Sequence, residues 1–475
     1  MKRILLLVML LFAPGLFAQR VLNLEDALSI ARRESYLIKS ADFNLLRSEK
    51  SLEATKLGLR TSVDMEFDVP SYSRNLTSYF NETSQKNEFY EVGSTRYESR
   101  LSIRQPIVFT NGRFSVTGQL FGRNQFSQRF PSSDDFYSNV VLSLNQPLFT
   151  FNTQKADLER AELNLEVTQK NYSRTEADIV YSVTEAFFNL YKAKKNFEIT
   201  QEKVRQTDVS YETALNKFKA GLIAEVDALQ LEVELASAKN DLLNTERHYN
   251  EAKDNFKLLI GLDLSENIDI IAQIEYSPVR VERDEAVAYA LKNRPELFSS
   301  EAEIRLSELQ MDEIDARNNI KAELNLNYGI NKVDTSFGSV FNNFLQNRSV
   351  VFTVSVPVWD WGRNSREVES AEAGLRLSRL TYDNQKQNII NEITQLINRI
   401  ESAKARVEVL SRSVEVADKS FNISMERFKS GNITSFDLSQ MQIKLTDAKI
   451  NSLTALIDYK LAVADLNRRT LHKFD

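Results

Sequence analysis

Two stretches of the chain decide its fold: "NKFKAGLIAEVDALQLEVELASAK" at residues 216–239 and "ERFKSGNITSFDLSQMQIKLTDAK" at residues 426–449. In each stretch a phenylalanine and a lysine precede a glycine, Gly221 in the first and Gly431 in the second, and a helix-forming run follows. A glycine just past a helix is typical of a left-handed C-terminal cap. Each stretch therefore predicts the tip of a helical hairpin, where one helix ends and another begins.

The hairpin tips belong to a longer internal repeat. Residues 147–249 match residues 357–459 without a gap at an offset of 210, and the N-terminal parts of the two copies match at an offset of 259. The difference of 49 residues is extra sequence in the first copy. Such recurrence predicts two copies of one supersecondary unit, which we expect at residues 19–283 and 284–475.

Each copy contains one very long helix. Apolar residues step by three and four along residues 153–218 and along the matching part of the second copy, with one four-residue stutter at Ile179–Val183 and at Ile389–Ile393. This pattern is typical of a coiled coil whose supercoil relaxes at one level. About 65 helical residues give a rod of roughly 100 Å.

Shorter helices complete each copy. The periodicity predicts a return helix after each hairpin tip, about half as long as the first helix, and a single helix at the start of each copy. The predicted return helices are Ala224–Ile260 and Ser435–Arg469, and the predicted opening helices are Leu24–Gly58 and Asp284–Arg317.

Between the helices the apolar period changes to two. The alternating apolar residues are Val63, Met65, Phe67 and Val69; Val140, Leu142 and Leu144; Leu324, Leu326, Tyr328 and Ile330; and Val350, Phe352, Val354 and Val356. About ten residues of alternation is typical of a transmembrane β-strand, and a half-buried strand of a soluble sheet shows the same period. The acidic residues between the first four, with a secretory signal, favour a barrel with a wet lumen.

The extra 49 residues of the first copy show the same alternation. Residues 97–103 and 114–120 alternate on either side of Thr110–Asn111–Gly112, which is a hairpin-turn signal. This segment predicts a second strand pair, which would give six strands per chain. An elaborated surface loop is the alternative.

Composition excludes several classes of protein. The net charge of −6 argues against a nucleic-acid partner, because binding phosphates requires an excess of Lys and Arg. The chain has no cysteine and only two histidines, so thiolate sites, a zinc centre and a Ser-His-Asp triad are not expected. Without a Gly-rich phosphate loop or a nucleophile motif, we expect no enzyme and no cofactor or metal.

The N-terminus has the features of a secretory signal. Lys2 and Arg3 precede an apolar run at residues 4–12, and Ala18 offers a small residue for cleavage. The apolar run is shorter than the roughly 20 residues that span a membrane. We therefore predict a signal peptide at residues 1–18 rather than a membrane anchor.

The order of these elements, given twice after a signal peptide, resembles the TolC-like outer-membrane efflux family (outer membrane factors). The resemblance covers essentially all of the mature chain. Each of its motifs is weakly specific alone, but together they keep a constant repeat spacing. The motifs are "LEDALSIARRES" (24–35), "RDEAVAYALKNRPEL" (283–297), "LLIGLDL" (258–264) and the two hairpin tips "FKAG" and "FKSG".

The resemblance implies a mostly α protein with β-structure, which works as an exit duct for export. Long coiled-coil hairpins would form a trimeric α-barrel in the periplasm, joined to a transmembrane β-barrel shared by three copies in outer-membrane lipid. The implied partners are two further copies, a periplasmic adaptor (membrane fusion) protein and an inner-membrane transporter. The strand count agrees independently, since four to six strands cannot close a barrel that needs about eight.

The resemblance also implies where such a channel closes. Asp227 and Asp437 match the acidic positions of the family's closed tip, and Phe218 and Phe428 supply apolar packing there. Ile433 stands where the best-known member has an arginine, so that member's polar latch is not reproduced. A carboxylate in the first turn of a helix also complements the helix dipole, which is the alternative role for both aspartates.

Two further sets of residues follow from the resemblance. The candidates for docking the adaptor are Lys219, Gly221, Lys429 and Gly431 at the hairpin tips. Phe149, Trp359 and Trp361 stand where strand changes to helix and suit a membrane–water interface. Packing in a core is their alternative role.

Two other functions fit the sequence. A secreted coiled-coil structural or adhesion protein would use the same repeat with soluble strands. A duct of the same fold could also serve protein secretion instead of efflux of small molecules, because the inner-membrane partner selects the substrate.

Overall fold

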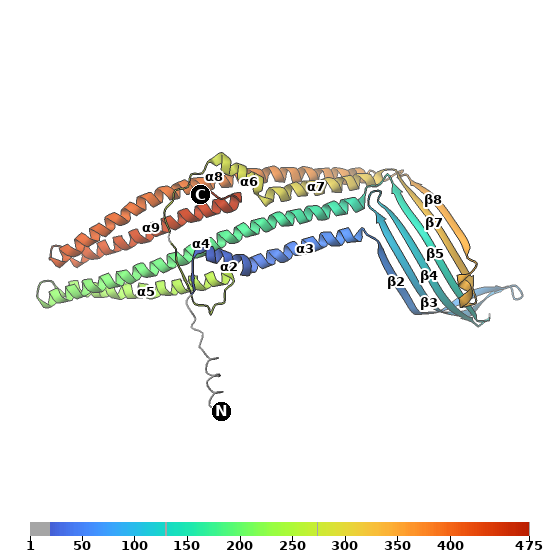
Figure 1. The fold of residues 1–475 in the computed structure, drawn as a ribbon, viewed down its shortest axis with the longest axis horizontal. Helices are drawn as coiled ribbons and strands as arrows, with labels where there is room; N and C mark the ends of the chain where they lie inside the picture. The colour runs from blue at the N-terminus through green and yellow to red at the C-terminus, as the bar shows by residue number, and fades with distance from the viewer. Residues whose placement is uncertain (1–19, 129–130, 273, 475) are drawn as a thin grey trace, which may run out of the picture. The chain divides into compact units, whose positions relative to one another are not determined.

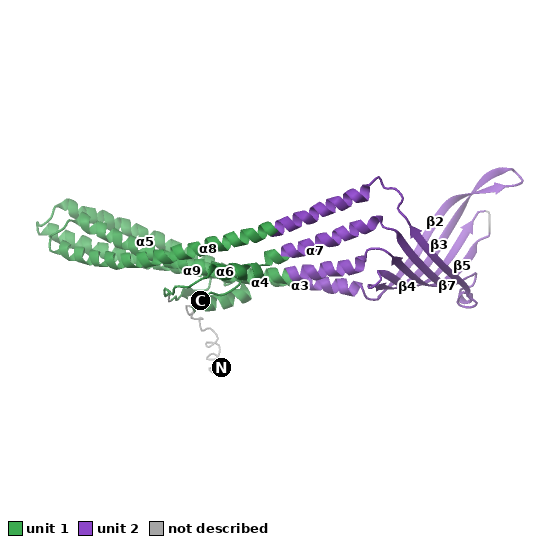
Figure 2. Ribbon diagram, turned by 90° about the horizontal axis from the view of Figure 1, so that it is seen from above, with its two compact units in different colours: residues 1–45, 168–298, 383–475 green, residues 46–167, 299–382 purple. Residues whose placement is uncertain are grey.

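The computed structural model describes residues 20–128, 131–272 and 274–474. The predicted signal peptide, residues 1–18, lies outside the described residues. The chain divides into two compact units (Figure 2). Unit 1 comprises Met1–Leu45, Thr168–Phe298 and Asp383–Asp475, and unit 2 comprises Leu46–Val167 and Ser299–Tyr382.

The order of elements repeats, as the sequence predicts (Figure 1). Each copy has two helices, a set of strands, one long helix and one return helix. The first copy comprises β1 (Arg20–Leu22), α2 (Leu24–Glu34), α3 (Tyr36–Gly58), β2 (Ser62–Asn81), β3 (Lys86–Ile107), β4 (Gly112–Ser127), β5 (Ser133–Leu148), α4 (Thr153–Lys219), α5 (Glu225–Ile260) and β6 (Ile268–Ile270). The second comprises α6 (Arg283–Asn293), α7 (Pro295–Asp315), η1 (Ala316–Asn318), β7 (Lys321–Asp334), η2 (Phe337–Phe341), β8 (Leu345–Ser355), α8 (Arg363–Lys429) and α9 (Ser435–Thr470).

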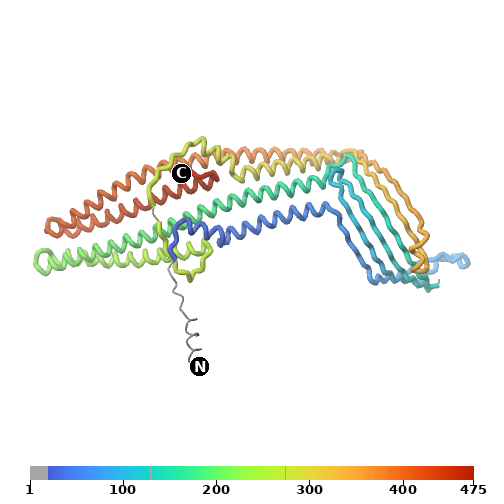
Figure 3. The backbone as a smooth tube through the Cα atoms, in the orientation of Figure 1, coloured from blue at the N-terminus to red at the C-terminus, as the bar shows by residue number. Residues whose placement is uncertain are grey.

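The two helical hairpins are confirmed. The long helices α4 and α8 have 67 residues each, and the return helices α5 and α9 have 36 each. The turns between them place Gly221 at φ 73° and Gly431 at φ 78°, a backbone conformation that glycine adopts without strain. The tube in Figure 3 shows both reversals of the chain.

The sequence predicted one continuous opening helix in each copy, and this prediction is wrong. The helix breaks at Ser35 between α2 and α3, and at Arg294 between α6 and α7, where both residues have extended backbone. Pro295 explains the second break, because proline disfavours helical geometry in the residue before it. At the first break the Ser35 hydroxyl accepts a hydrogen bond from the backbone N–H of Ile38 at 3.3 Å, as an N-cap does.

The main core of unit 1 forms where α2 meets the long helix α4 and the return helix α5. Helix α2 packs against α5, and α6 packs against α9. A short parallel pairing of β1 with β6, which the sequence did not indicate, closes one side of this core. The fully buried side chains of the core include Leu22, Ile30, Val183, Phe187, Phe256, Ile260 and Ile268.

Unit 2 contains a six-stranded antiparallel sheet in the order β2-β3-β4-β5-β7-β8. The extra residues of the first copy form β3 and β4, so the prediction of a second strand pair is confirmed and the loop alternative is wrong. Asn111 takes φ 60° in the predicted turn between them. Strand β8 ends at Ser355, one residue before Val356, the last residue of the predicted alternation.

The register of the sheet sorts its two faces by polarity. One row of paired residues runs Met65, Leu101, Gly118, Val140 and Ile330, and the next runs Glu66, Arg100, Gln119, Asn139 and Asn331. The first face is mostly apolar, with polar exceptions such as Ser99, Ser138 and Lys332, and the second carries hydrogen-bonded polar side chains. We call these the apolar face and the polar face.

Candidate functional site

The two hairpins of the chain are packed together near their tips. Phe428 is 2 % exposed there, whereas the matching Phe218 is half-buried against the same cluster. This cluster draws on all four hairpin helices: Ala214, Ala228, Leu231, Phe421, Phe428, Leu438 and Leu445. The candidate phenylalanines therefore join the two hairpins of one chain, and Phe428 contributes most to the joint.

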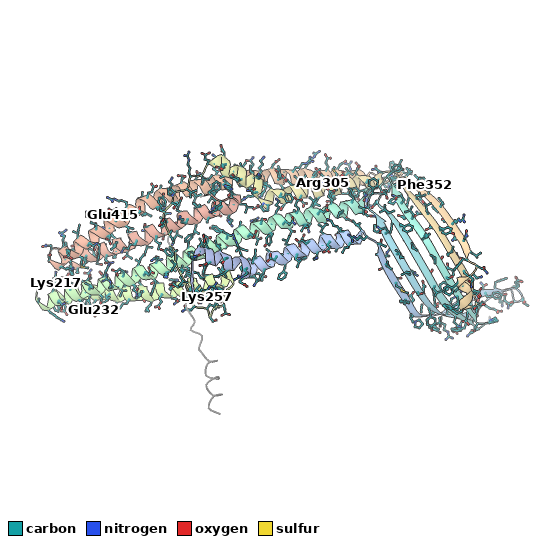
Figure 4. The ribbon with its side chains drawn as sticks, viewed as in Figure 1. Lys217, Glu232, Lys257, Arg305, Phe352 and Glu415 are labelled. Atoms are coloured by element: carbon teal, nitrogen blue, oxygen red, sulfur yellow. The ribbon has the colours of Figure 1, made fainter. Side chains whose placement is uncertain are left out.

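A lysine that the sequence reading missed completes this contact. Lys217 donates a hydrogen bond to the backbone carbonyl of Phe428, and its ammonium lies 4.7 Å from the centre of the Phe428 ring. Figure 4 shows Lys217 at the end of α4 beside the hairpin tips. The sequence does hold a signal for this residue: Lys217 stands directly before "FKAG", and the second copy also has a basic residue, Arg427, at that position.

The two candidate aspartates have different roles, although they match in the repeat. Asp437 forms a capping box with Thr434, accepting from the Thr434 N–H at 3.2 Å while its own N–H donates to the Thr434 hydroxyl at 3.1 Å. Asp227 instead accepts a hydrogen bond from the Ser435 hydroxyl at 3.0 Å, which ties α5 to α9. The residue before α5, Ala224, provides no side-chain cap.

The docking candidates lie in the open turns of the tips. A side chain added at Gly221 or Gly431 would meet no atom within 4 Å, and Lys429 reaches only Glu426 on its own helix, at 2.9 Å. Lys219 is exposed as well. A surface cavity of about 530 Å³ lies beside these turns, and its lining includes Lys217, Asp227, Phe428 and Ser435. The accessible part of the tip therefore consists of backbone, lysine side chains and the exposed Leu222, whereas Phe428 lies beneath it.

The aromatic candidates of unit 2 are exposed in the chain. Phe149, Trp359 and Trp361 are 79 %, 75 % and 89 % exposed, which argues against packing in a core of this chain. The two tryptophan rings meet edge to face with their centres 5.6 Å apart. Phe109, in the β3–β4 turn, is 94 % exposed and extends the set, although the sequence reading did not include it.

A second polar cluster lies in unit 1, where side chains from both copies form one ion-pair chain. In order, its members are Glu296, Arg174, Asp178, Arg468, Asp465, Arg469, Glu392 and Arg294. The Arg294 guanidinium is 2.6 Å from the Glu392 carboxylate and also donates to the backbone carbonyl of Arg469 at 3.0 Å. A cavity of about 210 Å³ opens among these side chains.

The charges in this ion-pair chain are partly buried. Burial lowers the pKa of the Arg294 guanidinium, and burial together with the positive charge of Arg294 lowers the pKa of Arg469. Burial also opposes the charge of Arg468, but hydrogen bonds and charge from Asp465 and Asp178 outweigh it and raise the pKa of Arg468. The alternation of sign therefore places a carboxylate beside each guanidinium, and the side chains of Arg294, Arg468 and Arg469 are largely buried among these partners.

Among the described residues, no helix is both long and apolar enough to cross a membrane. The same residues contain no group of three or more His, Asp or Glu side chains placed to hold a metal ion.

Comparison with known proteins identifies the family. The family model for outer membrane efflux proteins matches residues 115–262 and 286–470, one segment in each copy of the repeat. The chain belongs to this family. The predicted resemblance is thereby confirmed, as is the predicted location in the outer membrane with an extension into the periplasm. The family consists of channel proteins that act in efflux, in line with the expectation that the chain is not an enzyme.

Individual relatives are distant. Nodulation protein T of Rhizobium leguminosarum bv. trifolii is 20 % identical over 76 % of this chain and 76 % of its own length. The cation efflux system protein CusC of Escherichia coli (strain K12) is 21 % identical over 64 % of this chain and 65 % of its own length.

Solved structures share the fold at low identity. The Campylobacter jejuni CmeC outer membrane channel is 14 % identical, with a TM-score of 0.71 over 95 % of this chain and 86 % of that one. The outer membrane protein VceC of Vibrio cholerae is also 14 % identical, with a TM-score of 0.69 over 95 % of this chain and 97 % of that one. These likenesses support the fold, and the family match supports an efflux role.

Proposed function

We propose that three copies of this chain form the outer-membrane exit duct of a tripartite export system. The observation that carries the proposal is the six-stranded sheet, with one apolar and one polar face and with β2 and β8 as its outer strands. Unpaired strand edges are not tolerated in a lipid bilayer, so these edges must pair with other copies. Three copies would supply 18 strands, a number that leaves an aqueous channel.

The stagger of the sheet supports closure into a barrel. A row of paired residues that starts at Ser62, the first residue of β2, passes through Arg104, Ser115 and Asn327. It reaches β8 at Ser349, which lies six residues before the end of that strand. The strands are therefore staggered by about one residue each, and a tilted, staggered sheet is what a closed barrel requires. The apolar face would contact lipid, and the polar face would line the lumen.

The hairpins would form the periplasmic part of the duct. The open turns at Lys219, Gly221, Lys429 and Gly431 would meet the periplasmic adaptor protein, which links the duct to an inner-membrane transporter. Phe218, Phe428, Asp227 and Asp437 would form the gate at these tips. The buried Phe428 and its lysine contact support this role, because they hold the two hairpins together and must separate if the tip opens.

The mass of the purified protein tests the assembly. Extraction of the outer-membrane fraction in detergent should yield a trimer by native mass spectrometry. A chain that is monomeric and soluble without detergent would contradict the proposal and would favour the secreted coiled-coil alternative.

Single-channel recording tests the gate. Phe428→Ala should leak more than Ile433→Ala, because Phe428 is buried at the joint between the hairpins. The double change Asp227→Ala with Asp437→Ala should weaken block by divalent cations, since it removes six carboxylates from the trimer. If divalent block survives this change, the aspartates serve only as the cap and the hydrogen-bond acceptor described above.

A further inference from the structure

The helices of the two copies of the repeat correspond residue by residue. Helices α2 and α3 begin 259 residues before α6 and α7, and α4 and α5 begin 210 residues before α8 and α9. Each long helix also meets its own opening helix at matching positions. The Tyr172 hydroxyl is hydrogen-bonded to Asp42, and the Tyr382 hydroxyl donates to Glu301 at 3.1 Å. A contact in one copy can therefore be compared with the same positions of the other.

Charged side chains join α4 to helices of the second copy. Four acidic or basic residues on one side of α4 each pair with an opposite charge on α7 or α9. The pairs are Arg174–Glu296 at 2.9 Å and Asp178–Arg468 at 3.1 Å in unit 1, and Glu159–Arg305 at 2.7 Å and Arg160–Glu313 at 2.9 Å in unit 2. Arg305, on α7, is labelled in Figure 4. We call these four pairs the internal joint, because they link the two copies of the repeat within one chain.

The positions that match the internal joint are exposed and almost free of charge. The residues that match its α4 members are Glu369, Ser370, Asn384 and Asn388 on α8. The residues that match its α7 and α9 members are Leu37, Leu46 and Ala54 on α3 and Leu258 on α5, and the three leucines are 46 %, 47 % and 60 % exposed. Only Glu369 among these eight residues is charged, and it pairs with Arg366 of its own helix at 2.6 Å.

We propose that these two exposed sides meet between subunits, and that the presence or absence of charge decides which helices become neighbours in the trimer. Helix α8 of one subunit would pack on α3 and α5 of the next, as α4 packs on α7 and α9 within the chain. Asn384 would then lie opposite Leu37 of the partner subunit, and Asn388 opposite Leu258 of the partner subunit. This pairing rule rests on the proposed trimer.

The charges of the internal joint disfavour the wrong neighbours. If α8 packed on α7 and α9 of another subunit, Glu296 and Arg468 there would face amides instead of opposite charges. If α4 packed on α3 and α5 of another subunit, Arg174 and Asp178 would face leucines. A covered charge without a partner destabilises an interface, and such a mismatch gives specificity against the wrong pairing. Ionic contacts within subunits and uncharged contacts between them therefore specify a closed head-to-tail ring.

A charge pair built at the contact between subunits tests the rule. Asn384→Arg and Leu37→Glu should each lower the trimer-to-monomer ratio by about tenfold, because each places an unpaired charge at a covered position. The two changes together recreate the Arg174–Glu296 pair, so they should recover most of the trimer and make it more sensitive to NaCl than the original protein. The matched control, Asn384→Arg with Leu37→Arg, places like charges there and should stay dissociated. Native mass spectrometry of the detergent-extracted protein over a dilution series measures the ratio.

Cross-linking gives a second test that introduces no charge, because the chain has no cysteine of its own. Asn388→Cys combined with Leu258→Cys should yield covalent dimers and trimers with a short bifunctional maleimide. The control Lys386→Cys with Leu258→Cys moves the first thiol to the other side of α8 and should leave the subunits unlinked.

The outcomes separate the pairing rule from the trimer itself. A trimer that assembles equally well with like and with opposite charges at positions 37 and 384 would overturn the rule and leave the proposed function standing. A trimer in which the Asn388→Cys and Leu258→Cys pair stays unlinked would do the same. A monomeric original protein would instead contradict the proposed function.

Discussion

Neutralising Glu392 should destabilise the helical part of the protein more than any exposed acidic residue does. Its carboxylate accepts from the Arg294 guanidinium at 2.6 Å and pairs with Arg469 as well. Glu392→Gln would leave these two positive groups facing each other, and the Arg294 side chain is only 9 % exposed. Removing one partner of a buried pair costs about 3–5 kcal/mol, and the partial exposure of Glu392 reduces this to about 2–3 kcal/mol.

Thermal unfolding of the detergent-solubilised protein, followed by helical circular dichroism, measures this effect. In a chain of 475 residues, whose unfolding entropy is about 1 kcal/mol/K, a loss of about 2–3 kcal/mol should lower Tm by about 2–3 °C. The control is Glu415→Gln on the same helix, labelled in Figure 4, because Glu415 is exposed and pairs only with the nearby exposed Arg412. An exposed pair of this kind contributes at most about 1 kcal/mol, so Tm should hardly change.

A double change tests the reason for the effect. Arg294→Met combined with Glu392→Gln removes both members of the Arg294–Glu392 pair, so no charge of that pair remains without a partner. It should recover part of the stability that Glu392→Gln alone loses. Equal Tm changes for Glu392→Gln and Glu415→Gln, or strictly additive losses in the double variant, would refute the assignment of this ion-pair chain as a stabilising joint between the two copies.

Two further pairs of substitutions test the sheet and the hairpins. Val140→Arg on the apolar face should cost about 2–4 kcal/mol in lipid and reduce the amount of assembled trimer in outer-membrane fractions. The control Asn139→Arg, on the polar face, should assemble normally. Similar trimer yields from both variants would contradict the assignment of the faces. Thr434→Ala removes the capping box of α9 and should lower the free energy of unfolding by about 1 kcal/mol, which lowers Tm. Ala224→Ser should cap α5 and raise the free energy of unfolding by a few tenths of a kcal/mol, which raises Tm slightly.

The sequence alone determined the long helices, the return helices and the strands, because these features depend on local periodicity. Heptad steps require one side of a helix to be apolar, and alternation requires one side of a strand to be apolar, so both elements are readable from neighbouring residues. The hairpin tips at Gly221 and Gly431 and the extra strand pair around Asn111 follow from the same local rules, because a backbone with positive φ demands particular residues. The family motifs are local in the same sense.

The tertiary structure alone decided which distant residues act together. Asp227 and Asp437 are equivalent in the repeat, yet one accepts from Ser435 on another helix while the other caps its own, because only α9 begins with a threonine that can complete the box. The ion-pair chain and the Lys217 contact with Phe428 join positions more than 200 residues apart. Such contacts depend on how packed helices orient their side chains, and no periodicity within one segment encodes that orientation.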